Sequence, residues 1–218
     1  MALPNVRRSV FAAMLTLAFA GGAEAAIKTQ EIEYDHGGTK LLGYLAYDDA
    51  VQGKRPGVVV VHEWMGHNEY ARKRAEQLAG LGYAAFALDM YGKGVRARDP
   101  QEAGQMAGRF KNDRKLMRDR ARAGLDVLKQ QQVVDPGRLA AMGYCFGGQV
   151  SLELARAGTE LAGVVSFHGA LDTPTPQDAK NIKARCWPCT ARPTPSSRRN
   201  TSTRSSRRWR TRRPTTSS

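Results

Sequence analysis

Cysteines, acidic residues and long apolar runs are all scarce in this sequence. Its 218 residues include three cysteines, too few for the disulfide framework of a small secreted scaffold. Asp and Glu number 20 against 34 Lys and Arg, which gives a formal net charge of +14. The sequence offers no stretch of about 18 apolar residues, the length that a membrane-spanning helix needs. A hydrophobic share of 41% remains, and with this length it predicts a globular protein with one main core.

The excess positive charge is concentrated at the C-terminus. Residues 186–218 hold nine arginines and no acidic residue, so residues 1–185 carry only +5. The segment is rich in Ser, Thr and Pro and has no hydrophobic periodicity, which is typical of a solvated, disordered tail. A basic run of this kind can also bind nucleic acid or an anionic surface. No folded basic domain surrounds it, and we predict no nucleic-acid partner.

The N-terminus has the pattern of an export signal. Arg7 and Arg8 precede an apolar stretch at residues 10–20, and Ala23-Glu24-Ala25 supplies a small-residue cleavage pattern. We therefore predict that residues 1–25 are a signal peptide and that the mature protein is periplasmic or secreted, with no stable membrane insertion. The alternative is an uncleaved membrane anchor, and the paired arginines leave the twin-arginine route open.

Strand and helix patterns alternate through the middle of the chain. Residues 29–34 and 41–47 alternate apolar and polar side chains around Gly37-Gly38, which predicts an antiparallel hairpin. Four further apolar runs predict buried strands, and three helical patterns lie between them. The strands are expected at 57–61, 84–90, 139–143 and 161–167, and the helices at 70–81, around 117–128 and at 149–157. This order predicts an α/β fold with a mostly parallel sheet and helices on both faces.

The strongest chemical motif is Gly143-Tyr144-Cys145-Phe146-Gly147-Gly148. It follows a buried strand and opens a helix, as in the G-x-S-x-G nucleophile elbow, with Cys in place of Ser. Glycines are needed there because the sharp turn brings backbone segments into close approach. The helix N-terminus favours a thiolate, and the backbone N–H of Phe146 points to where an oxyanion would form. The alternative is a buried structural cysteine in a glycine-rich turn.

A second motif, His62-Glu63-Trp64-Met65-Gly66, stands at the end of an earlier strand. In a parallel sheet the chemistry collects at the carboxyl ends of the strands, so Glu63 is in the right place to face the elbow. An ordinary exposed loop carboxylate is an equally good interpretation from sequence alone.

Together with Asp89-Met90-Tyr91-Gly92-Lys93 and Asp135-Pro136-Gly137-Arg138, these motifs resemble the dienelactone hydrolases of the α/β-hydrolase fold. The resemblance runs from about residue 29 to residue 185. It implies that Cys145 is the nucleophile, that Glu63 holds the thiol at rest and helps to generate the thiolate, and that the N–H groups of Trp64 and Phe146 form an oxyanion hole. It also implies an ester or lactone as the small-molecule substrate, and no cofactor or metal.

One family position is altered. Dienelactone-hydrolysing members place an arginine after the Asp-x-Tyr segment to bind the substrate carboxylate, and Lys93 stands there in this chain. Lysine keeps the charge but loses the bidentate geometry, which argues against a dienelactone as the substrate.

The end of the domain departs from the family. A nucleophile of this type needs a later His as base and an Asp to orient it. Only His168 follows Cys145, at a position where a structural histidine is expected, and only Asp172 and Asp178 follow His168. We therefore predict a C-terminally incomplete hydrolase domain over residues 26–185 with impaired activity.

The codons of residues 186–191, read one base earlier, permit an apolar strand ending in His-Gly, and an Asp-Pro can follow. This favours the hypothesis of a reading-frame shift after Arg185. The C-x-x-C motif of Cys186 and Cys189 offers a different function, a thiol redox protein, and a catalytically inactive exported binding protein is the other alternative. A thioredoxin-like site needs this motif at the start of a helix, and the nearby prolines argue against one.

Overall fold

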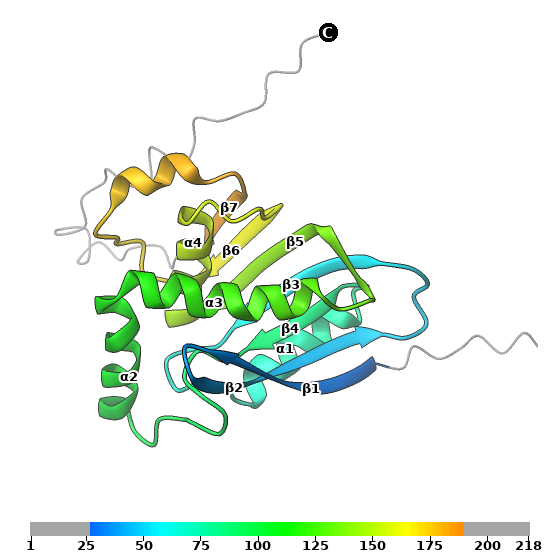
Figure 1. Ribbon diagram of the computed structural model, residues 1–218, viewed down its shortest axis with the longest axis horizontal. Coiled ribbons are helices and arrows are strands. Elements are labelled where there is room, and N and C mark those ends of the chain that lie inside the picture. Colours follow the sequence, from blue (N-terminus) through cyan, green and yellow to red (C-terminus); the bar gives the residue numbers. More distant parts are fainter. Residues whose placement is uncertain (1–26, 190–218) are drawn as a thin grey trace, which may run out of the picture.

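A seven-stranded sheet organises residues 27–189, the part of the chain that the computed structural model describes (Figure 1). Its strand order is β1-β2-β4-β3-β5-β6-β7. The strands are β1 (Ile27–His36), β2 (Thr39–Asp48), β3 (Arg55–Val61), β4 (Ala84–Leu88), β5 (Val134–Tyr144), β6 (Gly163–Phe167) and β7 (Arg185–Cys189). The helices are α1 (Glu69–Ala79), α2 (Pro100–Asn112), α3 (Arg114–Lys129) and α4 (Phe146–Arg156), with a 3₁₀ turn, η1, at Pro176–Asn181.

The antiparallel part of the sheet is the predicted hairpin of β1 and β2. The two strands pair from Ile27 opposite Asp48 to His36 opposite Thr39. Gly37 and Gly38 form the turn with φ of +58° and +73°, the left-handed conformation that favours glycine. This part of the sequence prediction is confirmed, and the strands extend beyond the predicted ranges at both ends.

The remaining strands are parallel to one another, as the alternation of strands and helices predicted. β4, β3, β5, β6 and β7 pair in parallel, and β2 joins the set through an antiparallel pairing with β4. Every residue of β4 is buried, and all but Pro56 of β3 is buried. The carboxyl ends of β3, β5 and β6 therefore lie side by side at one edge of the sheet, where α/β proteins place their sites.

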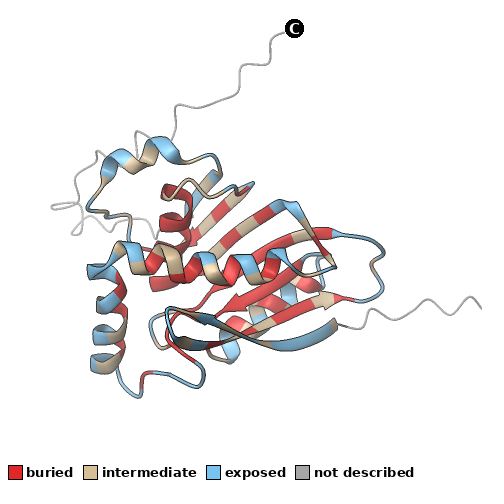
Figure 2. Cartoon of the chain, in the orientation of Figure 1, coloured by how far each residue is buried: buried red, intermediate tan, exposed pale blue. Residues whose placement is uncertain are grey.

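Helices cover both faces of the sheet (Figures 1 and 2). The two layers differ in composition. α1 packs its alanine face, Ala71, Ala75 and Ala79, against small and β-branched residues of β2, β3 and β4. α3 and α4 cover the opposite face, where the larger aliphatic and aromatic side chains form the main core. These layers support an α/β-hydrolase-like fold.

The main differences from the sequence prediction lie at α2, α4 and β5. The described structure has a separate helix, α2, which begins at Pro100 and is capped by Asp99. α4 begins at Phe146, three residues before the predicted helix. The expected turn at Asp135-Pro136-Gly137 lies within β5, where the pairing with β3 jumps from Asp135 to Leu139. The Asp135 side chain still accepts a hydrogen bond from Gly137 N, so the local turn forms as an interruption of a longer strand.

The sheet includes a strand that begins at Arg185, where the sequence analysis expected the domain to end. Residues 185–189 form β7, which pairs with β6 from Gly163 opposite Arg185 to Phe167 opposite Cys189. Backbone pairing with β6, rather than hydrophobic alternation, places this segment in the sheet, since four of its five residues are exposed and the fifth, Cys186, is only partly buried. The predicted signal peptide and residues 190–218 of the predicted tail lie outside the described residues.

Among residues 27–189, none of the helices combines the length and apolar character that crossing a membrane requires.

Gly124 and Gly104 test how closely the helices pack. A Cβ at Gly124 in α3 would lie 2.7 Å from Leu88 Cβ, whereas one at Gly104 in α2 would meet nothing within 4 Å. We expect Gly124→Ala to lower the free energy of unfolding by about 1–3 kcal/mol through overpacking. Gly104→Ala should raise it by about 0.5–1 kcal/mol because alanine favours helix. Urea denaturation measures both, and changes of the same sign would contradict this account of α3.

A buried charge cluster fastens α4 to α3. Glu153 is fully buried and receives Arg118 Nη2 at 2.6 Å on one oxygen and Arg156 Nη1 at 2.7 Å on the other. Arg156 also donates to Leu171 O, and Arg118 pairs with Asp178 at 2.8 Å. The cluster thus holds the segment that follows β6.

Loss of the central carboxylate should leave two arginines without their shared acceptor. We expect Glu153→Ala to cost about 3–5 kcal/mol of unfolding free energy. Glu160→Ala is the matched control, because Glu160 pairs with Lys183 at the surface and its loss should cost no more than about 1 kcal/mol. Equal losses in the two variants, measured by urea denaturation, would show that the cluster is not a stabilising one.

Candidate active site

Three adjacent strands bring Glu63, Cys145 and His168 to one edge of the sheet. The parallel register pairs Val61 of β3 with Gly143 of β5, so Glu63 and Cys145 each lie two residues beyond the last shared pair. Tyr144 pairs with Phe167 of β6, and His168 is the next residue along. The predicted neighbourhood of Glu63 and Cys145 at the strand ends therefore agrees with the sheet register.

Cys145 occupies the sharp turn between β5 and α4. Its φ is +53° and its ψ is −114°, a conformation that non-glycine residues rarely adopt. The Cys145 N–H donates to Phe167 O at 2.9 Å, and Cys145 O accepts from Gln149 N at 3.3 Å. These hydrogen bonds fix the turn on both sides while the residue itself is only partly buried.

The glycines around Cys145 are explained by backbone contact. A Cβ at Gly143 would lie 2.2 Å from Gly147 O, and one at Gly147 would lie 2.2 Å from Val61 O. A Cβ at Gly148 would lie 2.7 Å from Ser166 Oγ. β5, α4 and the neighbouring strands β3 and β6 thus meet so closely at the elbow that side chains at these three glycine positions would push them apart.

Two backbone N–H groups near the elbow have no acceptor within residues 27–189. Phe146 is the first residue of α4, so its N–H has no partner inside the helix. The N–H of Trp64, in the turn that follows β3, also donates to no described group. These are the two donors expected for an oxyanion hole, and that role remains a prediction.

The side chains of Glu63 and His168 approach each other across the strand ends. His168 Nε2 lies 3.8 Å from Glu63 Oε1, and the two side chains are 56% and 36% exposed. His168 has a φ of +44°, and its N–H donates to Cys189 O at 2.7 Å. We expected a satisfied structural histidine here, but the exposed imidazole instead faces the carboxylate that the sequence singled out.

Tyr91 and His62 support the site, and the sequence analysis gave neither of them a role. The Tyr91 hydroxyl donates to Trp64 O at 2.9 Å, and burial, with a smaller contribution from the charge of Cys145, raises the pKa of this phenol. His62 Nε2 accepts from Met90 N at 3.1 Å, so its Nδ1 carries the proton that is donated to Glu63 O. Burial lowers the pKa of His62, which is therefore neutral. Both residues lie close after the carboxyl end of a strand, and this position is the sequence signal that could have identified them as site residues.

Lys93, expected to bind substrate, is engaged by another carboxylate. Its Nζ forms an ion pair with Glu33 of β1, and both side chains are about half exposed. A substrate carboxylate would have to compete with Glu33 for this cation. That pairing could not be read from sequence, because the two residues are 60 positions apart.

Both acidic residues that follow His168 are bound to other elements. Asp172 pairs with Arg114 at 3.1 Å and accepts from Gln149 Nε2. Asp178 accepts from the Thr175 hydroxyl at 2.6 Å and pairs with Arg118, and these interactions, the Thr175 bond first, lower its pKa. In the described part of the chain, neither carboxylate pairs with a histidine.

Cys186 and Cys189 do not form a redox dithiol in this structure. Both lie in β7 rather than at the start of a helix, and both thiols are free. Residues three apart in a strand point to opposite faces of the sheet. Burial raises the pKa of Cys186 to about 11, whereas Cys189 is exposed. This geometry counts against the thiol redox alternative.

Residues 27–189 contain no cluster of three or more His, Cys, Asp or Glu side chains that could hold a metal ion.

Comparison with known proteins decides the family. The model of the dienelactone hydrolase family matches residues 41–193, well over half of the sequence. The chain belongs to the dienelactone hydrolase family. It is 33% identical to "Protein usf" of Aquifex pyrophilus over 159 residues, which cover 71% of this chain and 67% of that one.

Two solved structures agree with this membership. One, titled m3DLH, is 45% identical, with a TM-score of 0.74, and the match covers 76% of this chain and 69% of the other. The other is a dienelactone hydrolase-like promiscuous phosphotriesterase, P91, from metagenomic libraries. It is 38% identical with a TM-score of 0.73, over 78% of this chain and 71% of that one. The chain spans only between 50% and 60% of several other curated relatives.

Alkylation should distinguish the three thiols of this family member. We expect iodoacetamide at neutral pH to modify Cys145 and Cys189 faster than Cys186, because burial keeps the Cys186 thiol protonated. In a Cys186→Ser/Cys189→Ser variant, one carbamidomethyl group should be found on Cys145 by peptide mass spectrometry. Folded protein of this variant that stays unmodified would show that the Cys145 sulfur is not accessible for chemistry.

Proposed function

We propose that this chain is a hydrolase of carboxylic esters or lactones that uses Cys145 as its nucleophile. The observation that carries the proposal is the positive φ of Cys145 at the β5–α4 turn, maintained by glycines that leave no room for side chains. Family membership supports hydrolysis of an ester or lactone bond. The N-terminus of α4, which is the positive end of the helix dipole, lies next to Cys145 and favours a thiolate.

The proposed reaction has two steps. In the first, the Cys145 thiol gives its proton to Glu63, and the sulfur attacks the substrate carbonyl carbon. The carbonyl electron pair moves to oxygen, which the N–H groups of Trp64 and Phe146 stabilise. The tetrahedral intermediate then collapses, and the alcohol leaves with the proton from Glu63. In the second step water attacks the thioester, releases the carboxylic acid and restores the thiol.

The His168–Glu63 pair supports this use of Glu63. A carboxylate that is in contact with an imidazole on one side and lies level with Cys145 on the other can move a proton between the thiol and the substrate. The exposed tryptophan and tyrosine around it, Trp64 and Tyr70, each 38% exposed, give the entrance an apolar character that suits an aromatic or cyclic substrate.

We further propose that activity in this chain is low. The family chemistry needs an Asp-oriented histidine, and within the described residues Asp172 and Asp178 are held by arginines. Removing a member of such a triad reduces turnover on the order of 10⁴-fold. The signal-like pattern of residues 1–25 leads us to propose that this hydrolase works in the periplasm or outside the cell.

A phenyl ester such as p-nitrophenyl acetate tests the proposal. We expect slow, measurable hydrolysis by the wild-type chain and loss of at least about 10²-fold in kcat/KM for Cys145→Ala, because the acyl-enzyme can no longer form. The Cys186→Ser/Cys189→Ser variant is the matched control and should keep wild-type activity. Activity that survives Cys145→Ala but depends on Cys186 and Cys189 would overturn the proposal and favour the redox alternative.

A further inference from the structure

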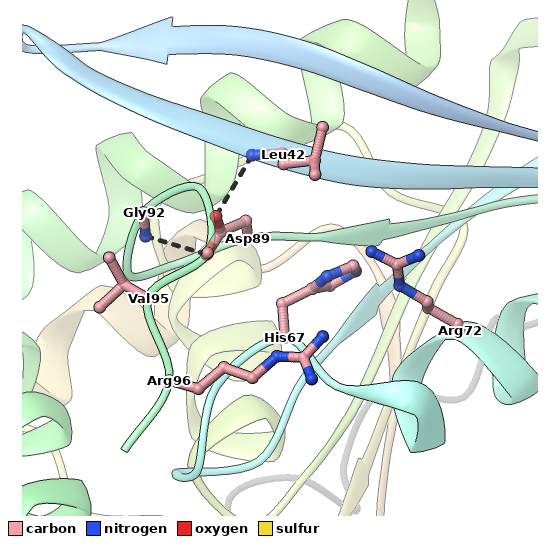
Figure 3. Close-up of a pocket in the computed structure, with 8 residues that line it drawn as sticks. Leu42, His67, Arg72, Asp89, Gly92, Val95 and Arg96 are labelled. Atoms are coloured by element: carbon pink, nitrogen blue, oxygen red, sulfur yellow. Dashed lines mark hydrogen bonds between the residues drawn. The ribbon is translucent and has the colours of Figure 1, made fainter. Parts of the chain in front are cut away.

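A small cavity lies beside the loop that follows β4. Its volume is about 60 Å³, and its lining includes His67, Arg72 and Arg96, together with Leu42, Asp89 and Gly92. The three basic residues come from different segments: the loop before α1, the first turn of α1, and the loop after β4. Figure 3 shows the imidazole of His67 lying between the guanidinium groups of Arg72 and Arg96.

Two buried nitrogen atoms at this cavity have no hydrogen-bond partner within the described residues. They are Nε2 of His67, a residue that is only 6% exposed, and Nε of Arg72. A buried donor or acceptor left unpaired costs about 1–3 kcal/mol, so native structures rarely contain one without an unseen partner. Arginine Nε can only donate, and therefore the missing partner of Arg72 must be an acceptor.

The charges around the cavity define that acceptor. Arg96 has neither an ion pair nor a side-chain hydrogen bond among residues 27–189, and Arg72 binds Glu31 through Nη1, which leaves its Nε free. Burial first, and then the nearby charges of His62, Arg72 and Arg96, lower the pKa of His67 to about 3, so its imidazole is neutral at pH 7. The hydrogen bond that the imidazole donates to the backbone of Ala87 places its proton on Nδ1, because Nε2 has no partner among the described residues. Nε2 therefore carries a lone pair, which can accept a hydrogen bond from a protonated oxyanion.

Asp89 also lines the cavity, but its oxygens are already occupied. Oδ1 accepts from the backbone N–H groups of Tyr91 at 2.8 Å and Gly92 at 3.0 Å, and Oδ2 accepts from Leu42 N at 3.2 Å. Three backbone dipoles thus stabilise this carboxylate, and Arg72 and Arg96 remain available to a second anion.

We propose that this cavity binds a small, singly protonated oxyanion of the phosphate class between Arg72 and Arg96, with Arg72 Nε as a further donor and His67 Nε2 as the acceptor for the ion's hydroxyl group. The bound ion would join the loop before α1 to the segment after β4, which already meet in the isolated pairing of Gly66 with Arg96. These same segments lead back to Trp64 and Tyr91 at the candidate active site, so the ion would stabilise the outer wall of that site.

Inorganic phosphate is the probe, and thermal unfolding of the full chain is the first measurement. At tenfold excess over its dissociation constant, phosphate should raise the wild-type Tm by about 3–6 °C relative to sodium chloride of equal ionic strength. Arg96→Gln should abolish the rise. Lys111→Gln is the matched control, since it removes an exposed positive charge from α2, and it should keep the full rise.

Imidazole ¹⁵N chemical shifts supply a second readout that does not require a variant. Phosphate should shift the His67 Nε2 resonance of the wild-type protein, with smaller changes for His36 and His168. The proposal is overturned if phosphate leaves the wild-type Tm unchanged, or if Arg96→Gln responds as strongly as wild type. A response of that second kind would place the phosphate elsewhere, for example on the nine arginines of residues 186–218.

Discussion

The left-handed turn at Cys145 is the constraint on which the rest of the site depends. A positive φ at a non-glycine residue costs about 1–3 kcal/mol, and it persists only where the surroundings leave no alternative. Here other conformations of the turn are excluded because backbone segments are in close contact: Gly147 lies against Val61 O, and Gly143 lies against Gly147 O. The same contacts that force the strain also set the register of β3 and β5, and so they place Glu63 level with the sulfur.

The sequence predicted the central strands well because their signal is local. Buried runs of β-branched and apolar residues produce β3, β4 and β5 whatever lies around them. α2 was not predicted because two of its three buried residues, Ala103 and Ala107, are alanines, which give only a weak hydrophobic periodicity. β7 was not predicted because its composition resembles that of the C-terminal tail, and only its pairing with β6 makes it a strand.

The residues of the candidate site also fall into two groups, those that local sequence predicts and those that it does not. Cys145 and Glu63 could be selected from sequence because a turn motif and a strand end are encoded by neighbouring residues. The tertiary partners of these side chains could not be predicted. Glu33 of the first strand pairs with Lys93, and Glu63 meets His168 across the end of the one intervening strand, β5. Such pairs depend on tertiary contacts between residues 60 or more positions apart, for which a single sequence has no periodic signal.

The fold and the chemistry of this chain are separable for a physical reason. The turn, its glycines and the two N–H groups that have no acceptor among residues 27–189 belong to β3, β5, β6, α4 and the loops that follow these strands, and this part is complete by Gly169. α4 is fastened independently, through the buried Glu153 between two arginines. Neither device requires an acid–base pair from later in the chain. A nucleophile position of this kind can therefore be held in its strained geometry even where the triad histidine and its orienting carboxylate are not supplied, and what is lost is proton transfer rather than the shape of the elbow.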